Sequence, residues 1–196
     1  MQSFNHRMGQ KIRTDAAGKS IDRGFIAHFQ VAATDAVATS NTAVLAATAL
    51  TTAAQAIVED ITNPAVPRNL IVKGNASGIT GDVVIEGTNI EGGIITETIA
   101  LNGATAVEGN KAFATVTEIN LPVEVNAGTD TVSVGFGNKL GLPYKLAHNT
   151  VLAAYLDNAK EGTAPTVTVS AAALESNTLK LNSALNGKVV DAYLIV

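Results

Sequence analysis

Hydrophobic positions along this chain recur mostly at every second residue, in short segments separated by glycine, asparagine and proline. β-Branched residues are frequent in these segments, and a period of two is typical of strands with one buried face. The pattern is clearest between residues 55 and 146, with strands predicted at 55–61, 69–73, 82–87, 94–101, 111–121 and 131–137. Further strands are predicted at 25–33 and, in the C-terminal part 150–196, at 150–156, 166–170, 178–181 and 189–196.

Turn residues separate the predicted strands at intervals of roughly 8–12 residues, a spacing typical of a sandwich or barrel. The loops 74–78 and 88–93 are interpreted as hairpin-like, and Asn102-Gly103 as a tight reversal. Residues 35–56 are rich in alanine, but frequent threonine and valine favour an extended or irregular segment over a helix. The sequence therefore predicts an all-β antiparallel body, a β-sandwich or barrel-like domain over residues 25–196, preceded by an extended arm at 1–24.

Two of the predicted strands have faces of different character. In the first strand, Phe25, Ala27, Phe29 and Val31 share one face, and Ile26, His28 and Gln30 share the other. In the last strand, Ala192, Leu194 and Val196 share one face, and Asp191, Tyr193 and Ile195 share the other. An exposed apolar end of the chain would promote aggregation, so we expect this last strand to be paired within a sheet.

Charge is distributed unevenly between the arm and the body. Residues 1–23 contain five basic and two acidic residues, a net charge of +3, whereas the rest of the chain has eight basic and fifteen acidic residues, a net charge of −7. The basic residues of the arm are Arg7, Lys11, Arg13, Lys19 and Arg23. They are candidate contacts to an acidic surface of a partner, although a solvated terminus explains them equally well.

Residues that carry chemistry do not cluster along the chain. There is no cysteine, and His6, His28 and His148 lie far apart, so no metal-ligand spacing occurs; His28 is interpreted as a structural or solvent-facing residue. The run 135–139 lacks the spacing of a phosphate-binding loop, and the oxygen-bearing groups at 81–82, 89–91 and 130 are interpreted as turn residues. No cofactor or metal is expected.

Three carboxylates, Glu86, Glu97 and Glu118, fall in the middle of predicted strands. A facing pair would permit acid–base catalysis, but solvent-facing positions on a sheet are the favoured interpretation. Because no other catalytic arrangement accompanies them, the chain is not expected to be an enzyme. The net negative charge of the body does not favour binding of nucleic acid. The stretch 43–56, rich in alanine and threonine, is too short and too polar to span a membrane.

Several segments together resemble structural proteins of tailed bacteriophages. They are 66–75, 81–88, 95–103, 111–113 and 130–143, which include Val66-Pro67-Arg68-Asn69 and Lys139-Leu140-Gly141-Leu142-Pro143. The resemblance covers about half of the chain and implies a protein of the virion, assembled in the host cytoplasm. It implies a head decoration or cement protein, with the major capsid protein or other virion proteins as partners, and supplies no catalytic residues.

The leading hypothesis is therefore a homo-oligomeric protein that binds the capsid surface through its arm and stabilises the shell. A tail or fibre component is one alternative. A host- or glycan-binding β module is another, for which Tyr144, Tyr155 and Tyr193 are the only tyrosines that could contact a sugar. A glycosidase-like enzyme with paired carboxylates is the least favoured hypothesis.

Overall fold

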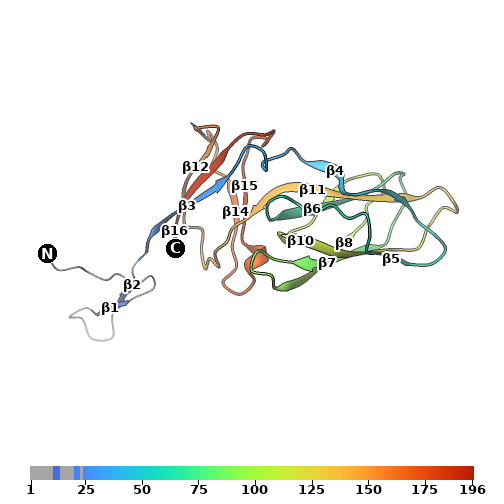
Figure 1. Ribbon diagram of the computed structural model, residues 1–196, viewed down its shortest axis with the longest axis horizontal. Coiled ribbons are helices and arrows are strands. Elements are labelled where there is room, and N and C mark those ends of the chain that lie inside the picture. Colours follow the sequence, from blue (N-terminus) through green and yellow to red (C-terminus); the bar gives the residue numbers. More distant parts are fainter. Residues whose placement is uncertain (1–10, 14–19, 23) are drawn as a thin grey trace.

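The computed structural model describes residues 11–13, 20–22 and 24–196, and over these residues the protein is almost entirely β (Figure 1). Beside one short 3-10 helix, η1 (Leu174–Ser176), the elements of this part of the chain are strands. They are β1 (Lys11–Arg13), β2 (Ser20–Asp22), β3 (Ile26–Val31), β4 (Ser40–Ala49), β5 (Gln55–Ile57), β6 (Arg68–Gly74), β7 (Asp82–Thr88), β8 (Ile94–Ala100), β9 (Val107–Glu108), β10 (Thr115–Leu121), β11 (Thr131–Gly141), β12 (Val151–Leu156), β13 (Ala159–Lys160), β14 (Thr166–Thr168), β15 (Thr178–Lys180) and β16 (Val190–Ile195).

The larger lobe is a sandwich of two antiparallel sheets. One sheet has the order β5-β10-β7-β8, and the other contains β4, β11, β6 and β9. Alternation along β7 turns Val83 and Ile85 inward, where they meet Leu70 and Val72 of β6 in one core; all four side chains are fully buried. Packing of two half-apolar sheets in this way explains the period-two pattern of the sequence.

The smaller lobe packs the sheet β13-β12-β16-β3 against β14, β15 and the end of β11. Its core includes Val31, Leu140, Leu179 and Leu194. The strand β16 lies between β12 and β3, which confirms that the apolar C-terminal segment is a paired strand. Because this central strand comes last in the sequence, the lobe is completed only by residues 190–195.

The long strand β11 belongs to both lobes. Its first residues, Thr131 to Phe136, pair with β4 and β6, whereas Lys139 to Gly141 pair with β15. Figure 1 shows β11 running from the sandwich toward the strands of the smaller lobe. The two cores are therefore joined through one continuous backbone.

A buried arginine fixes the junction between the lobes. Arg68 is 1% exposed, and its guanidinium donates hydrogen bonds to the carbonyl oxygens of Gly137 and Val37 and lies 5.5 Å from the ring centroid of Phe136. Burial lowers the pKa of Arg68 to about 10, so the group is still charged at neutral pH. Carbonyl dipoles and the aromatic face compensate part of the cost of burying this charge.

The predicted fold class, an all-β antiparallel body of sandwich type, is confirmed, and β4 confirms that the alanine-rich segment 35–56 contains extended chain. Four details were wrong. The loop 74–78 is not a hairpin, because β6 and β7 lie in different sheets. β5 ends at Ile57 rather than 61, β10 begins at Thr115 rather than 111, and β11 extends to Gly141 rather than 137. Each error concerns pairing or strand length, which tertiary contacts decide.

Of the predicted arm, the structure describes the backbone of β1 and β2, which pair antiparallel with Ile12 opposite Ile21. The arm residues Arg7, Lys19 and Arg23 lie outside the described residues. Lys11 and Arg13 fall in β1.

Candidate functional site

The candidate site is the outer face of the sheet β13-β12-β16-β3, the face turned away from the core of the smaller lobe. Alternation along β3 places Ile26, His28 and Gln30 on this face, while Ala27 and Phe29 pack against the core. Along β16, Tyr193 and Ile195 lie on the same face, and Leu194 is fully buried beneath it. The division of these two strands into faces, as predicted from the sequence, is confirmed.

Antiparallel pairing of β3 with β16 sets residues of this face directly opposite one another. Ile26 faces Ile195, His28 faces Tyr193, and Gln30 faces Asp191. The rings of His28 and Tyr193 are stacked, with centroids 4.8 Å apart and planes inclined by 9°. Contact between cross-strand neighbours at this spacing stabilises the orientation of both side chains on the sheet.

Asp191 is the polar centre of the face. Its Oδ1 accepts hydrogen bonds from Nε2 of His28 at 2.7 Å and from Nε2 of Gln30 at 2.8 Å, and its side chain is 12% exposed. Within the described part of the chain, its second oxygen, Oδ2, has no hydrogen-bond partner. Both donors come from β3, so the neighbouring strand orients the carboxylate.

Strand β12 completes the face on the other side of β16. Tyr155 lies opposite Asp191 and is edge-on to Tyr193 at 6.1 Å, whereas the small Ala153 lies opposite Tyr193. The turn from β12 to β13 consists of Asp157 and Asn158, both with positive φ (54° and 62°), which characterises a type I′ hairpin. This turn places Asn158 beside Tyr155, Asp191 and Tyr193, and the four residues line a hollow of about 340 Å³.

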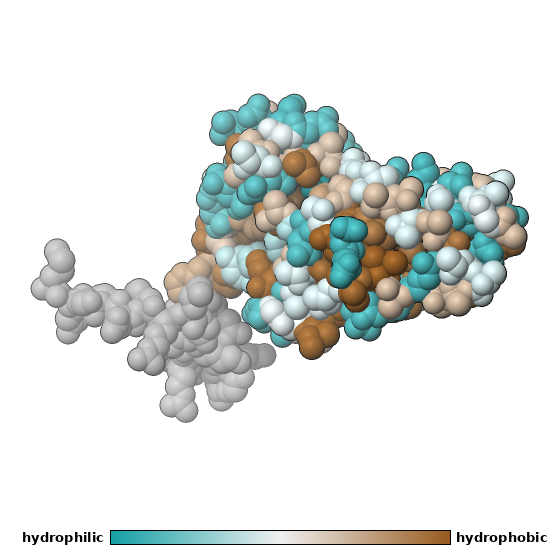
Figure 2. Space-filling model, turned by 45° about the vertical axis from the view of Figure 1, so that its right-hand side comes forward, coloured by the Kyte–Doolittle hydropathy of each residue, from teal (hydrophilic) through white to brown (hydrophobic). Residues whose placement is uncertain are grey.

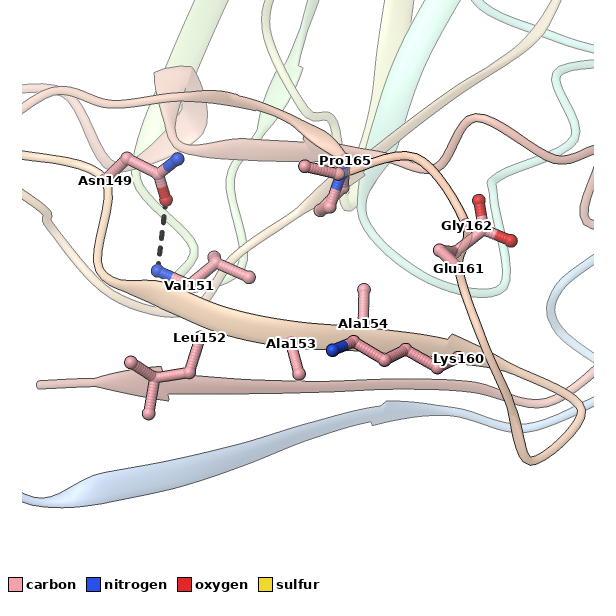
Figure 3. A pocket seen from close by; sticks show the side chains of 10 residues that line it. Asn149, Val151, Leu152, Ala153, Ala154, Lys160, Glu161, Gly162 and Pro165 are labelled. Atoms are coloured by element: carbon pink, nitrogen blue, oxygen red, sulfur yellow. Dashed lines mark hydrogen bonds between the residues drawn. The ribbon is translucent and has the colours of Figure 1, made fainter.

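The opposite end of the same face is apolar. Ile26 is 68% exposed, Ile195 40% and Leu152 56%, although all three are large hydrophobic residues. Leu152 lies at a β-bulge between Val151 and Ala153 and points to the same side of β12 as Ala153, whereas Ala154 points to the other side (Figure 3). We call Ile26, Leu152 and Ile195 the apolar end of the outer face; it includes the first residue of β3, which follows the basic segment 1–23 in the sequence.

A second hollow lies at the free edge of β12, beneath the segment 160–165 (Figure 3). It has a volume of about 290 Å³ and is lined mainly by aliphatic and small residues, Leu152 among them, with Lys160 and Glu161 at one end. Oε2 of Glu161 accepts hydrogen bonds from the backbone N–H groups of Asn182 and Ser183, so this carboxylate is used to fix a loop. The hollow therefore offers fewer groups to a ligand than the outer face.

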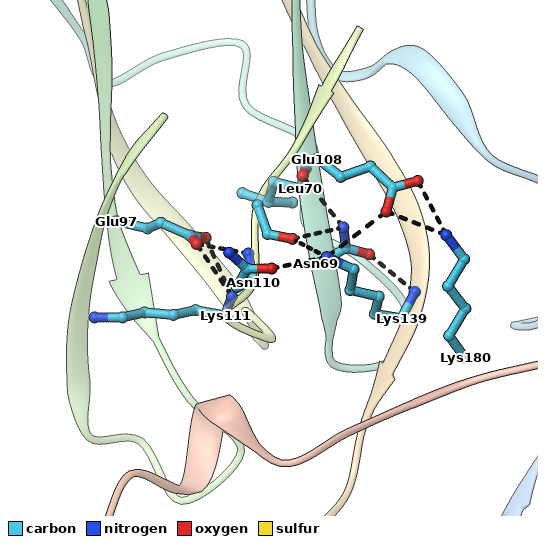
Figure 4. Close-up of polar contacts among 9 residues, drawn as sticks. Asn69, Leu70, Glu97, Glu108, Asn110, Lys111, Lys139 and Lys180 are labelled. Atoms are coloured by element: carbon cyan, nitrogen blue, oxygen red, sulfur yellow. Dashed lines mark hydrogen bonds and ion pairs between the residues drawn. The ribbon is translucent and has the colours of Figure 1, made fainter. Parts of the chain in front are cut away.

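The charged residues of the larger lobe are mostly used in structure. Figure 4 shows Glu97 accepting from the N–H groups of Asn110 and Lys111, and Glu108 paired with Lys139 at 3.7 Å and Lys180 at 3.3 Å. Glu97 lies on the same face of β8 as the buried Ile95 and Ile99, so the prediction that it lies on the solvent face was wrong. It lies inward because the loop after β9 supplies donors to its carboxylate.

Glu86 and Glu118 do face each other, as register partners of β7 and β10, and both are half-buried. Glu118 accepts a hydrogen bond from Nδ2 of Asn120. Neither carboxylate lines the hollow of the outer face or the hollow at the edge of β12. The pair marks the outer surface of the sandwich.

Other sequence candidates have structural surroundings. The run 135–139 lies within β11, and Asn89 uses its Oδ1 to accept from the N–H groups of Glu91 and Gly93 inside the β7–β8 turn. Among the described residues, no three His, Asp or Glu side chains are grouped so as to hold a metal ion, and no helix is long and apolar enough to cross a membrane.

Sequence reasoning missed the site as a whole. It placed His28, Asp191 and Tyr193 on the correct faces of their strands and named Tyr155 and Tyr193 as possible sugar contacts. It did not indicate that β3 and β16 are neighbours, since His28 and Asp191 are 163 residues apart in the sequence. Comparison of the chain with protein-family models, with curated proteins and with solved structures gives no significant match.

Proposed function

We propose that this protein is a structural component of a tailed-phage particle, which binds the capsid surface and stabilises the shell. The observation that carries the proposal is the apolar end of the outer face. Ile26, Leu152 and Ile195 present large hydrophobic side chains to solvent at the end of the sheet that follows the basic arm. Clustered exposed hydrophobic residues of this kind are typical of protein interaction surfaces.

The two features complement each other as one attachment device. The net charge of +3 on residues 1–23 would steer the arm to an acidic surface of the shell, and the adjacent apolar end would bury hydrophobic area there. Any protein that binds assembled shells in preference to free subunits adds its binding free energy to the stability of the shell. The larger lobe takes part in neither the electrostatic nor the hydrophobic contact, and it would project away from the shell.

Hydrophobic residues also gather elsewhere on the surface of the body, as Figure 2 shows for one side. One such place is a groove of about 430 Å³ between β4 and β5, lined by Leu45, Ile57 and Val58 among others. This groove lies on the larger lobe, away from the start of β3. It is therefore not part of the proposed attachment device.

Co-sedimentation with purified phage shells tests the proposal. We expect removal of residues 1–24 and the double substitution Ile26→Ser with Ile195→Ser each to weaken binding by at least tenfold. Ile94→Ser is the matched control, because Ile94 is 86% exposed but lies on β8 of the larger lobe. Equal binding by all four proteins would contradict the attachment device.

Electron microscopy of phage particles labelled with antibody against the protein distinguishes a head protein from a tail or fibre protein. Label on the head supports a decoration protein, and label on the tail or fibres supports the alternative structural role. Particles without label would overturn the assignment to the virion.

A further inference from the structure

We propose that the hollow lined by Tyr155, Asn158, Asp191 and Tyr193 binds a saccharide. Asp191 lies four residues from Ile195 on β16, and Tyr193 lies between them, so the hollow is next to the residues assigned to attachment but does not include them. The inference concerns a second binding site and does not depend on the function proposed above.

The aromatic groups supply a platform for the apolar face of a sugar ring. Tyr193 is 37% exposed and is held upright by the stacked ring of His28 on one side. On its other side the opposite residue is Ala153, whose methyl group leaves space next to the ring. Tyr155, edge-on to Tyr193, forms a wall of this space, so two tyrosines present apolar surface and hydroxyl groups together.

The polar groups of the hollow match the hydroxyl groups of a sugar. Asp191 offers the acceptor Oδ2, which has no partner among the described residues, and His28 and Gln30 fix the orientation of this carboxylate through Oδ1. Asn158 adds an amide that both donates and accepts, and the type I′ turn holds its backbone. A few fixed polar groups beside an aromatic surface are the usual composition of a small-ligand site.

A tyrosine pair with a carboxylate would also suit a cationic side chain of a peptide. Two observations favour the saccharide. Lys160 is the register partner of Tyr155 on β13, so a positive charge lies on the strand next to one wall of the hollow. Oδ1 of Asp191 is already used by His28 and Gln30, so one carboxylate oxygen is left for a ligand, whereas a bidentate arginine contact would use both.

Both sites of the outer face can be occupied at once. Asp191 and Ile195 are four residues apart on β16, which corresponds to about 13 Å along a strand, and Tyr193 lies between them. A saccharide bound beside Asp191 therefore leaves Ile26 and Ile195 free to contact a shell. A particle protein with this arrangement would carry a sugar-binding site close to its point of attachment.

The test uses the full chain on an array of neutral and acidic oligosaccharides, followed by saturation-transfer NMR with each sugar that binds. We expect Tyr193→Ala and Asp191→Asn to weaken binding by tenfold or more, and Tyr193→Phe, which keeps the ring, to weaken it less. Leu152→Ala is the control, since it alters the same face outside the hollow. Thermal unfolding of each variant shows whether its fold is retained.

Three outcomes would overturn the inference: no sugar on the array binds, binding is unchanged in folded Tyr193→Ala, or the hollow binds lysine- or arginine-containing peptides instead. Co-sedimentation with shells separates this inference from the proposed attachment. Tyr193→Ala should bind shells as the unaltered protein does, even where it has lost the sugar.

Discussion

At the scale of single residues, Gly137 shows why a glycine is required inside a strand. A Cβ at this position of β11 would overlap Oδ1 and Nδ2 of Asn69. Asn69 cannot move aside, because its Oδ1 accepts from the N–H of Lys139 and its Nδ2 donates to the carbonyl oxygen of Gly109. The glycine therefore permits a buried asparagine to bind two neighbouring segments at the junction of the lobes.

We expect Gly137→Ala to lower the free energy of unfolding by about 1–3 kcal/mol, the usual cost of overpacking a rigid site. Gly162→Ala is the matched control, because an added Cβ there meets no atom within 4 Å. Its effect should stay within about 0.5 kcal/mol. Urea denaturation of both variants measures the difference, and equal stabilities would contradict the role of Asn69.

Asp130 is a second residue whose surroundings make a measurable prediction. Its Oδ2 accepts from the backbone N–H groups of Asn126 at 2.7 Å and Val125 at 2.8 Å, and its Oδ1 accepts from Nδ2 of Asn126. The hydrogen bond from the backbone of Asn126 is the main cause that lowers the pKa of Asp130, while burial acts in the opposite direction. The ionised carboxylate thus holds the loop before β11.

A carboxylate whose pKa is lower in the folded than in the unfolded state stabilises the fold at pH values above its unfolded pKa. This contribution is lost as the pH falls through the folded pKa. We therefore expect stability to decrease below about pH 4, the ordinary range of an aspartate. In Asp130→Asn this decrease should be smaller, and stability at pH 7 should be lower. Denaturation from pH 2 to pH 7 tests this, with the exposed Asp82→Asn as a control for the loss of one carboxylate.

At the scale of elements, β16 shows how one strand contributes to both stability and binding. Leu194 is fully buried in the core of the smaller lobe, whereas its neighbour Ile195 is 40% exposed on the outer face. Adjacent residues of a strand point to opposite sides, so two similar side chains one position apart have different roles.

We expect Leu194→Ala to destabilise the protein by about 2–5 kcal/mol, because it leaves a cavity between two packed layers. Ile195→Ala should cost about 0.5 kcal/mol, the range of surface substitutions, and act mainly on attachment. Chemical denaturation of the two variants compares them directly. A larger loss in Ile195→Ala would show that the outer face is covered by other parts of the chain.

At the scale of the whole molecule, the two lobes have separate cores but share β11 and the buried Arg68. Unfolding either lobe would remove pairing partners from this strand and expose the arginine contacts of the other. The molecule should therefore behave as one cooperative unit, although Figure 1 shows two bodies of strands.

Calorimetry should accordingly show a single unfolding transition. Ile85→Ala in the larger lobe and Leu179→Ala in the smaller lobe each remove a fully buried side chain and should lower the Tm of that same transition. For a loss of about 3 kcal/mol the shift is roughly 6–12 °C in a chain of this size. Two transitions that respond separately to the two substitutions would show that the lobes unfold independently.

The sequence alone determined the class of fold and the faces of its strands, because alternation and turn residues act over a few neighbours. It separated His28 from Phe29 and separated Tyr193 and Ile195 from Leu194 as residues of opposite strand faces, and this division is confirmed. The basic arm at residues 1–24, which local composition predicts, lies mostly outside the described residues and stays a prediction. The capsid role suggested by its resemblance to phage proteins stays a prediction.

Only the tertiary structure decided which strands are neighbours. The site exists because β16 pairs with β3 on one side and β12 on the other, which brings His28, Tyr155 and Asp191 together from distant parts of the chain. Such pairing depends on the loop lengths and packing of the whole domain, and no pattern in a short segment of sequence records it. The inward position of Glu97 has the same origin, since donors from the loop after β9 hold it there.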